Sequence, residues 1–93
     1  MLTNDQKIVV LERAVYLIQN GIRDFMCTAI DLELRLTYGI DGKACDEIPE
    51  LLKYKPPGMK EETVWFQHRN KSIRIQILNE IIKELKERKG KDS

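Results

Sequence analysis

The sequence predicts a small all-α protein, a bundle of three to four helices with a proline-rich connection between its two halves. Three long segments carry apolar residues at the spacing of one helix face, and the one stretch that alternates with period two has no partner strand. All three prolines fall within residues 48–69, where they break helical structure. A chain of 93 residues forms one domain with a small core. We expect this domain to cover residues 1–89, with a disordered tail at residues 90–93.

The first helix is expected to run from Thr3 to Asn20. Thr3 and Gln6 have the spacing of a capping box, and Asn20 followed by Gly21 is a typical C-terminal stop. The segment between them is apolar around most of its circumference, with polar residues confined to a narrow strip. Such a helix is buried on more than one side, and a chain of 93 residues has little with which to cover it twice. We therefore predict a homo-oligomer that assembles through this helix.

The second helix is expected from Ile22 to a stop at Gly39. Its final part, residues 32–38, alternates apolar and polar residues as a half-buried strand does. We nevertheless predict a helix there, because the chain offers no clear strand to pair with it.

The connection and the last helix come next. Residues 39–47 are expected to form a loop around an Asp-Gly turn, and residues 49–53 a short helix, since proline suits a first helical turn. The Lys-Pro-Pro-Gly sequence at residues 55–58 ends that helix. The last helix begins either near Glu61 or after a bend near Asn70, and apolar residues then follow at helical spacing.

The net charge of +1 conceals an asymmetry between the halves. Residues 1–52 carry five Lys and Arg against nine Asp and Glu, a balance of −4, and residues 53–93 carry eleven against six, a balance of +5. The halves should attract each other, within one chain or between copies. Because the chain has no overall basic surface, we do not expect it to bind duplex nucleic acid.

Several functional classes are not expected from this sequence. No apolar run approaches the length of a membrane span, and the N-terminus lacks the features of a signal peptide, so we expect a cytoplasmic protein with Cys27 and Cys45 reduced. Two cysteines and one histidine are too few for a metal cage. Neither a phosphate-binding loop nor a dinucleotide motif occurs. We therefore expect no metal, no cofactor and no enzymatic activity.

Arg74 is the most informative residue of the last helix. It lies in line with the apolar stripe, and arginine is rarely buried without a partner. In one interpretation its stem lies along apolar surface or its guanidinium pairs with Glu33 or Glu50. In the other, Arg74 binds an anion. Arg69 and Lys71 favour the second interpretation, because a helix start beside several cations is a ready anion site.

Trp65 and Tyr54 are candidates for stacking on a base. An aromatic face beside Arg and Lys holds a nucleotide by stacking on one side and by charge on the other. Alternatively Trp65 belongs to the core, as the largest ring of a small domain usually does. His68 lacks the companion ligands or the oriented acid that zinc binding or acid–base catalysis needs. The candidate ligand-binding residues are Tyr54, Trp65, His68, Arg69, Lys71 and Arg74.

Short motifs along the chain carry a resemblance. They are C-T-A-I at residues 27–30, I-P-E at 48–50, K-Y-K-P-P at 53–57, W-F at 65–66, and a final helix with Arg74 and L-N-E-I-I at 78–82. In this pattern the chain resembles small uncharacterised proteins of tailed bacteriophages and prophages. The resemblance implies an inhibitor of host defence that grips a host protein or sequesters a nucleotide signal, usually as a symmetric oligomer. It assigns no functional residue.

The leading hypothesis is a non-enzymatic phage counter-defence protein in the host cytoplasm that sequesters a small anionic nucleotide as a homo-oligomer. Arg69, Lys71 and Arg74 would hold phosphate, and Trp65 or Tyr54 would stack on the base. The alternative is a protein–protein inhibitor or adaptor whose acidic first half occupies a basic surface of a host defence protein. A third possibility is a structural oligomerisation module without a ligand.

Overall fold

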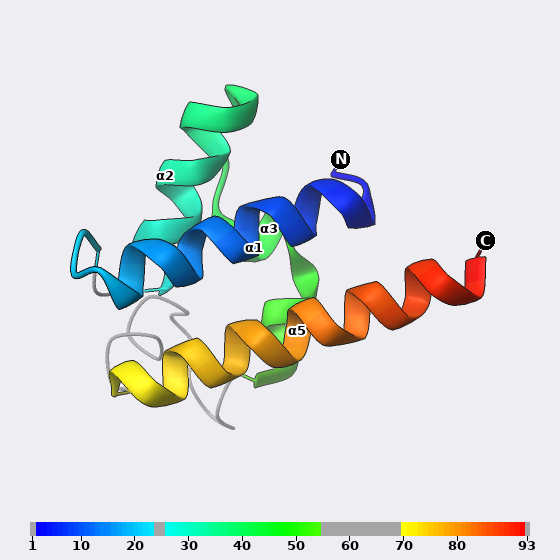
Figure 1. Ribbon diagram of the computed structural model, residues 1–93. Coiled ribbons are helices and arrows are strands. Elements are labelled where there is room, and N and C mark those ends of the chain that lie inside the picture. The colour runs from blue at the N-terminus through cyan, green and yellow to red at the C-terminus, as the bar shows by residue number, and fades with distance from the viewer. Residues whose placement is uncertain (1, 24–25, 55–69, 93) are drawn as a thin grey trace.

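The computed structural model describes residues 2–23, 26–54 and 70–92, and in these ranges every regular element is a helix. In chain order the elements are α1 (Asn4–Gln19), α2 (Met26–Tyr38), α3 (Ala44–Glu47), the 3₁₀ helix η1 (Pro49–Tyr54) and α5 (Lys71–Asp92). α1 packs against both α2 and α5, and α5 runs beside α1 along the molecule (Figure 1). The predicted all-α bundle is confirmed.

Both ends of α1 have the caps that its sequence predicts. The Thr3 hydroxyl accepts a hydrogen bond from the Gln6 backbone N–H at 3.2 Å, and the Gln6 side chain accepts one from the Thr3 N–H at 2.9 Å. At the other end Gly21 has a φ of +70°, and the N–H groups of Gly21 and Ile22 donate to the carbonyls of Ile18 and Leu17. This pattern is a Schellman motif, which places glycine in the left-handed region.

A single chain buries most of the apolar surface of α1. The buried residues of this helix are Lys7, Ile8, Val10, Leu11, Ala14, Val15, Leu17 and Ile18. The sequence argument for an oligomer assumed that one chain could not cover so broad an apolar surface, but packing against α2 and α5 covers it. Val9 and Tyr16 stay exposed, at 43% and 46%. Assembly through α1 stays a prediction, and only these two apolar side chains of α1 are open to a partner.

Residues 32–38 belong to α2, as predicted, and do not form a strand. One face of this helix supplies Ala29, Ile30 and Leu34 to the core. Leu36, in the last turn of the helix, is 70% exposed. α2 ends at Tyr38, and Gly39 then adopts a φ of +65°.

The segment between α2 and η1 differs from its prediction. A loop was expected over residues 39–47, but residues 44–47 form the single-turn helix α3. Its sequence, Ala-Cys-Asp-Glu, is too short to show helical periodicity, and its first two side chains are buried. The predicted short helix from Pro49 is present as η1, and Ile48 and Leu51 anchor it in the core with no exposed surface.

α5 begins at Lys71, after Asn70, so the helix does not run unbroken through Asn70. It continues to Asp92 and thus includes residues that were expected in the tail. The face of α5 that packs on α1 is apolar. Among the described residues, the largest fully buried side chains are Leu11, Ile18, Ile30, Leu34, Ile48, Leu51, Leu78, Ile81 and Leu85.

Candidate functional site

The predicted anion site includes the first turn of α5. The Asn70 side chain accepts a hydrogen bond from the Ile73 N–H at 2.9 Å, and the Arg74 N–H donates to the Asn70 carbonyl at 3.0 Å. Asn70 is therefore the N-cap, which explains why the helix starts there. In the described part of the chain, the N–H groups of Lys71 and Ser72 have no acceptor. They carry the partial positive charge of the helix N-terminus.

Lys71 and Arg74 lie one turn apart on this helix but differ in environment. Lys71 is exposed, and its ammonium donates to the Gln19 carbonyl at 3.3 Å, which ties the start of α5 to the end of α1. Arg74 is 8% exposed and has an interaction partner. The structure thus brings together a surface cation and a buried one.

The carboxylates proposed as structural partners of Arg74 pair with other cations. Glu33 lies 3.7 Å from the Arg13 guanidinium and accepts a hydrogen bond from the Thr37 hydroxyl at 3.0 Å. Glu50 pairs with Lys7 and Arg88. Lys7 comes from α1 and Arg88 from α5, two helices that pack against each other.

The other predicted site residues cannot be placed beside this turn. Trp65, His68 and Arg69 lie outside the described residues, and so does the side chain of Tyr54. The backbone of Tyr54 ends η1. The stacking role of Trp65 or Tyr54 and the phosphate role of Arg69 stay predictions.

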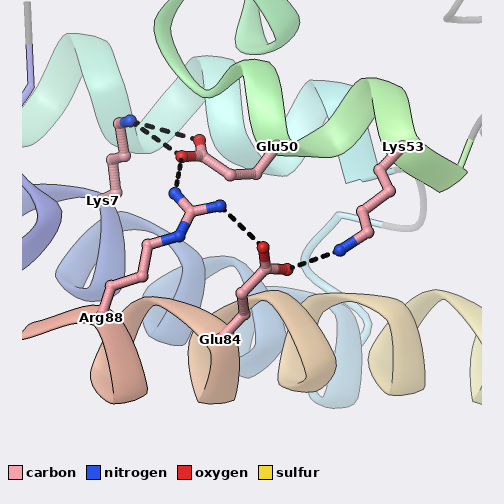
Figure 2. A network of polar contacts seen from close by, with 5 residues as sticks. All are labelled: Lys7, Glu50, Lys53, Glu84 and Arg88. Atoms are coloured by element: carbon pink, nitrogen blue, oxygen red, sulfur yellow. Dashed lines mark hydrogen bonds and ion pairs between the residues drawn. The ribbon is translucent and has the colours of Figure 1, made fainter. Parts of the chain in front are cut away.

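A network of ion pairs joins α1, η1 and α5 (Figure 2). The Lys7 ammonium lies 3.2 Å from both carboxylate oxygens of Glu50. Arg88 donates to Glu50 at 3.0 Å and to Glu84 at 2.7 Å, and Lys53 donates to Glu84 at 3.3 Å. Burial alone would raise the pKa of Glu50, but its own backbone N–H, Lys7 and Arg88 together hold that pKa below its ordinary value. Glu50 and Glu84 likewise raise the pKa of Arg88. The network therefore holds α1, η1 and α5 together.

A second polar region, which the sequence analysis did not single out, surrounds a cleft between α2, α3 and the loop that joins them. The cleft has a volume of about 420 Å³, within the range of small-molecule sites. Its lining residues are Asp31, Arg35, Ile40, Asp41, Gly42, Lys43 and Asp46. Asp31 and Arg35 come from adjacent turns of α2, which their i, i+4 spacing places on one face. That spacing was the only signal available in the sequence.

Asp31 is the least satisfied side chain of this cleft. Its Oδ1 atom is buried and has no hydrogen-bond partner among the described residues. Burial raises the pKa of Asp31 above its ordinary value; the Ala44 N–H, Arg35 and Lys43 oppose that rise but do not cancel it. A buried acceptor without a donor is uncommon in native proteins.

The described residues hold no group of three or more His, Cys, Asp or Glu side chains that could bind a metal ion. Cys45 is a buried free thiol on α3. No described helix has the length and apolar character needed to cross a bilayer.

Comparison with known proteins returned no match: no family model, no curated protein and no solved structure is similar to this chain. The resemblance to phage accessory proteins therefore stays a prediction.

Proposed function

We propose that this protein is a non-enzymatic binding protein that sequesters a small anionic nucleotide at the first turn of α5. The observation that supports the proposal is the helix start capped by Asn70, where two N–H groups without acceptors in the described chain adjoin the exposed ammonium of Lys71. Backbone N–H groups, the helix dipole and an exposed cation are the components of a phosphate site.

Arg74 contributes in a different way from Lys71. Its side chain is buried and has an interaction partner, so the proposal does not require Arg74 to bind phosphate directly. Arg74 lies one turn after Lys71 on the same helix and is proposed to support the start of α5. Arg69 as a phosphate ligand and Trp65 or Tyr54 as the stacking surface complete the proposed site.

The biological role that we propose is phage counter-defence in the host cytoplasm, by removal of a nucleotide signal without its turnover. Sequestration needs only a preformed site and sufficient protein. A homo-oligomer would present the site more than once. Val9 and Tyr16 are the exposed apolar residues of α1 through which it would assemble, and Arg13 lies over the Tyr16 ring at 4.9 Å.

A thermal melt with a panel of cyclic and linear nucleotides tests the proposal. A ligand at 100 times its dissociation constant adds about 2.7 kcal/mol to the free energy of unfolding, so the active nucleotide should raise the melting temperature saturably. Lys71→Ala should reduce its affinity about tenfold, the usual loss for one charge-assisted hydrogen bond. Lys83→Ala, an exposed lysine on the same helix, is the matched control and should bind as the wild type does.

Two results would contradict the proposal: no stabilisation by any nucleotide, or equal loss of binding in both lysine variants. The inhibitor with an acidic first half and the oligomerisation module without a ligand would then remain as hypotheses. Internal ion pairs weaken the first of these, because Glu12, Glu33 and Glu50 pair with Lys86, Arg13 and two further cations. Those acids are less available to a basic partner.

A further inference from the structure

The cleft between α2 and α3 is separate from the proposed nucleotide site and has a different electrostatic character. Three carboxylates line it, Asp31, Asp41 and Asp46, together with two cations, Arg35 and Lys43. Formal charges therefore sum to −1 when all five groups are ionised. A nucleotide with several phosphate charges would be repelled by the three acids, so this cleft is poorly suited to the ligand proposed for α5.

The walls of the cleft are held in place by local contacts. The Ala44 N–H at the start of α3 lies close enough to the Asp31 carboxyl group on α2 to lower its pKa. A Cβ atom on Gly42 would lie 3.0 Å from the end of the Glu47 side chain, so the loop passes close to α3 at this point. Because the loop and α3 are fixed to α2, the cleft is already formed and a ligand would pay little to order it.

The unpartnered Oδ1 of Asp31 calls for a physical explanation. Asparagine has nearly the same shape and would avoid burying a charge. If Asp31 had only a structural role, asparagine at this position would therefore give a more stable fold. A positively charged group bound in the cleft would lower the cost of keeping this carboxylate charged.

From this geometry we infer that the cleft binds a small zwitterion, of which a free α-amino acid is the simplest example. Its ammonium group would lie among Asp31, Asp41 and Asp46, and its carboxylate toward Arg35 and Lys43. An apolar ligand would leave five charged groups to be desolvated without compensation. A simple cation or a simple anion would pair with one sign and be repelled by the other. A molecule that carries both charges close together satisfies both groups.

The test is a thermal melt and an NMR titration of the full chain with each of the twenty common amino acids at millimolar concentration. At least one should raise the melting temperature saturably and shift the backbone amide signals around Asp31 and residues 40–46. The amine and the carboxylic acid that correspond to the best amino acid should each bind about tenfold more weakly or worse, because each lacks one charge-assisted contact. Absence of binding by every amino acid, or equal binding of the three compounds, would overturn the inference.

Asp31→Asn separates a ligand-binding role from a structural one. The variant should lose affinity for the amino acid about tenfold or more, while the unliganded protein should be at least as stable as the wild type. Unchanged affinity would overturn the inference. Arg35→Gln and Asp46→Asn alter exposed residues and should also weaken binding, so the test survives if Asp31→Asn fails to fold. Lys71→Ala should leave amino acid binding unchanged, which keeps this site distinct from the nucleotide site.

Discussion

Glu50 and Asp31 are two partly buried carboxylates whose pKa values move in opposite directions. In both, burial is the largest influence and raises the pKa. Around Glu50 the backbone, Lys7 and Arg88 supply enough donors to reverse that effect, whereas around Asp31 the Ala44 N–H and two more distant cations do not. Burial alone does not decide whether a carboxylate stabilises the fold; the number of donors that reach it does.

The two regions also differ in what they connect. Glu50 lies where α1, η1 and α5 meet, and its partners come from two of those elements (Figure 2). Asp31 lies on α2, near the start of the four-residue helix α3, and lines an open cleft. The first arrangement is expected of a residue kept for stability, and the second of one kept for binding.

Replacing Glu50 should have the largest effect on stability. Glu50→Gln removes the charge that neutralises Lys7 and Arg88, and the Lys7 side chain is only 10% exposed. Breaking a buried ion pair costs several kcal/mol because the remaining charge is uncompensated. Since Arg88 reaches solvent, we expect a loss of about 2–3 kcal/mol in the free energy of unfolding, measured by urea denaturation.

Glu87→Gln is the matched control, because Glu87 is an exposed carboxylate on α5 and its loss should change stability by less than about 0.5 kcal/mol. The contribution of Glu50 should be fully present above its ordinary pKa of 4.5 and disappear as the pH falls through its lower folded-state pKa. If Glu50→Gln and Glu87→Gln lowered the free energy of unfolding by equally small amounts, the ion-pair network would not stabilise the fold.

The opposite and smaller effect is expected at Asp31. Asp31→Asn should stabilise the unliganded protein by about 0.5–1 kcal/mol at neutral pH, because a neutral amide costs less to bury than a carboxylate. The contribution of Asp31 to the stability of the wild type should be most favourable below its ordinary pKa of 3.8. It should fall as the pH rises through the raised folded-state pKa.

The difference in the free energy of unfolding between Asp31→Asn and the wild type should accordingly be small in acid and grow toward neutral pH. Urea denaturation of both proteins across that range measures it. A variant less stable than the wild type at neutral pH would mean that Asp31 is paired in the folded protein and that its comparison with Glu50 fails.

The sequence predicts the helices well wherever a local signal exists. The capping box at Thr3, the stop at Gly21 and the apolar spacing of the long helices depend on residues a few positions apart, and the structure contains all of them. Residues 32–38 show why a period-two pattern alone misleads: without a partner strand, their backbone groups are satisfied only in a helix. α3 escaped prediction because one turn carries no periodicity.

The polar sites were less predictable because they depend on distant parts of the chain. Lys7, Glu50 and Arg88 are separated by 43 and 38 residues, and no local pattern joins them. The charge asymmetry of the two halves did predict their attraction, and the pairs of Glu12 with Lys86 and Glu50 with Arg88 are instances of it. Which acid meets which cation follows from helix packing, and the cleft beside Asp31 follows from the loop that closes it.

The Glu12–Lys86 pair offers the smallest effect and completes the comparison. The two charges approach to 3.7 Å, but their side chains are 53% and 58% exposed. Solvent screens such a pair, and its entropy cost offsets most of the attraction. Glu12→Gln should therefore change the free energy of unfolding by less than about 0.5 kcal/mol, and added salt should abolish the difference. Glu12 has one ion-pair partner and is open to water, whereas Glu50 has two partners and is mostly buried. A loss as large as that of Glu50→Gln would therefore show that the number of partners and their burial do not determine how much each acid contributes to stability.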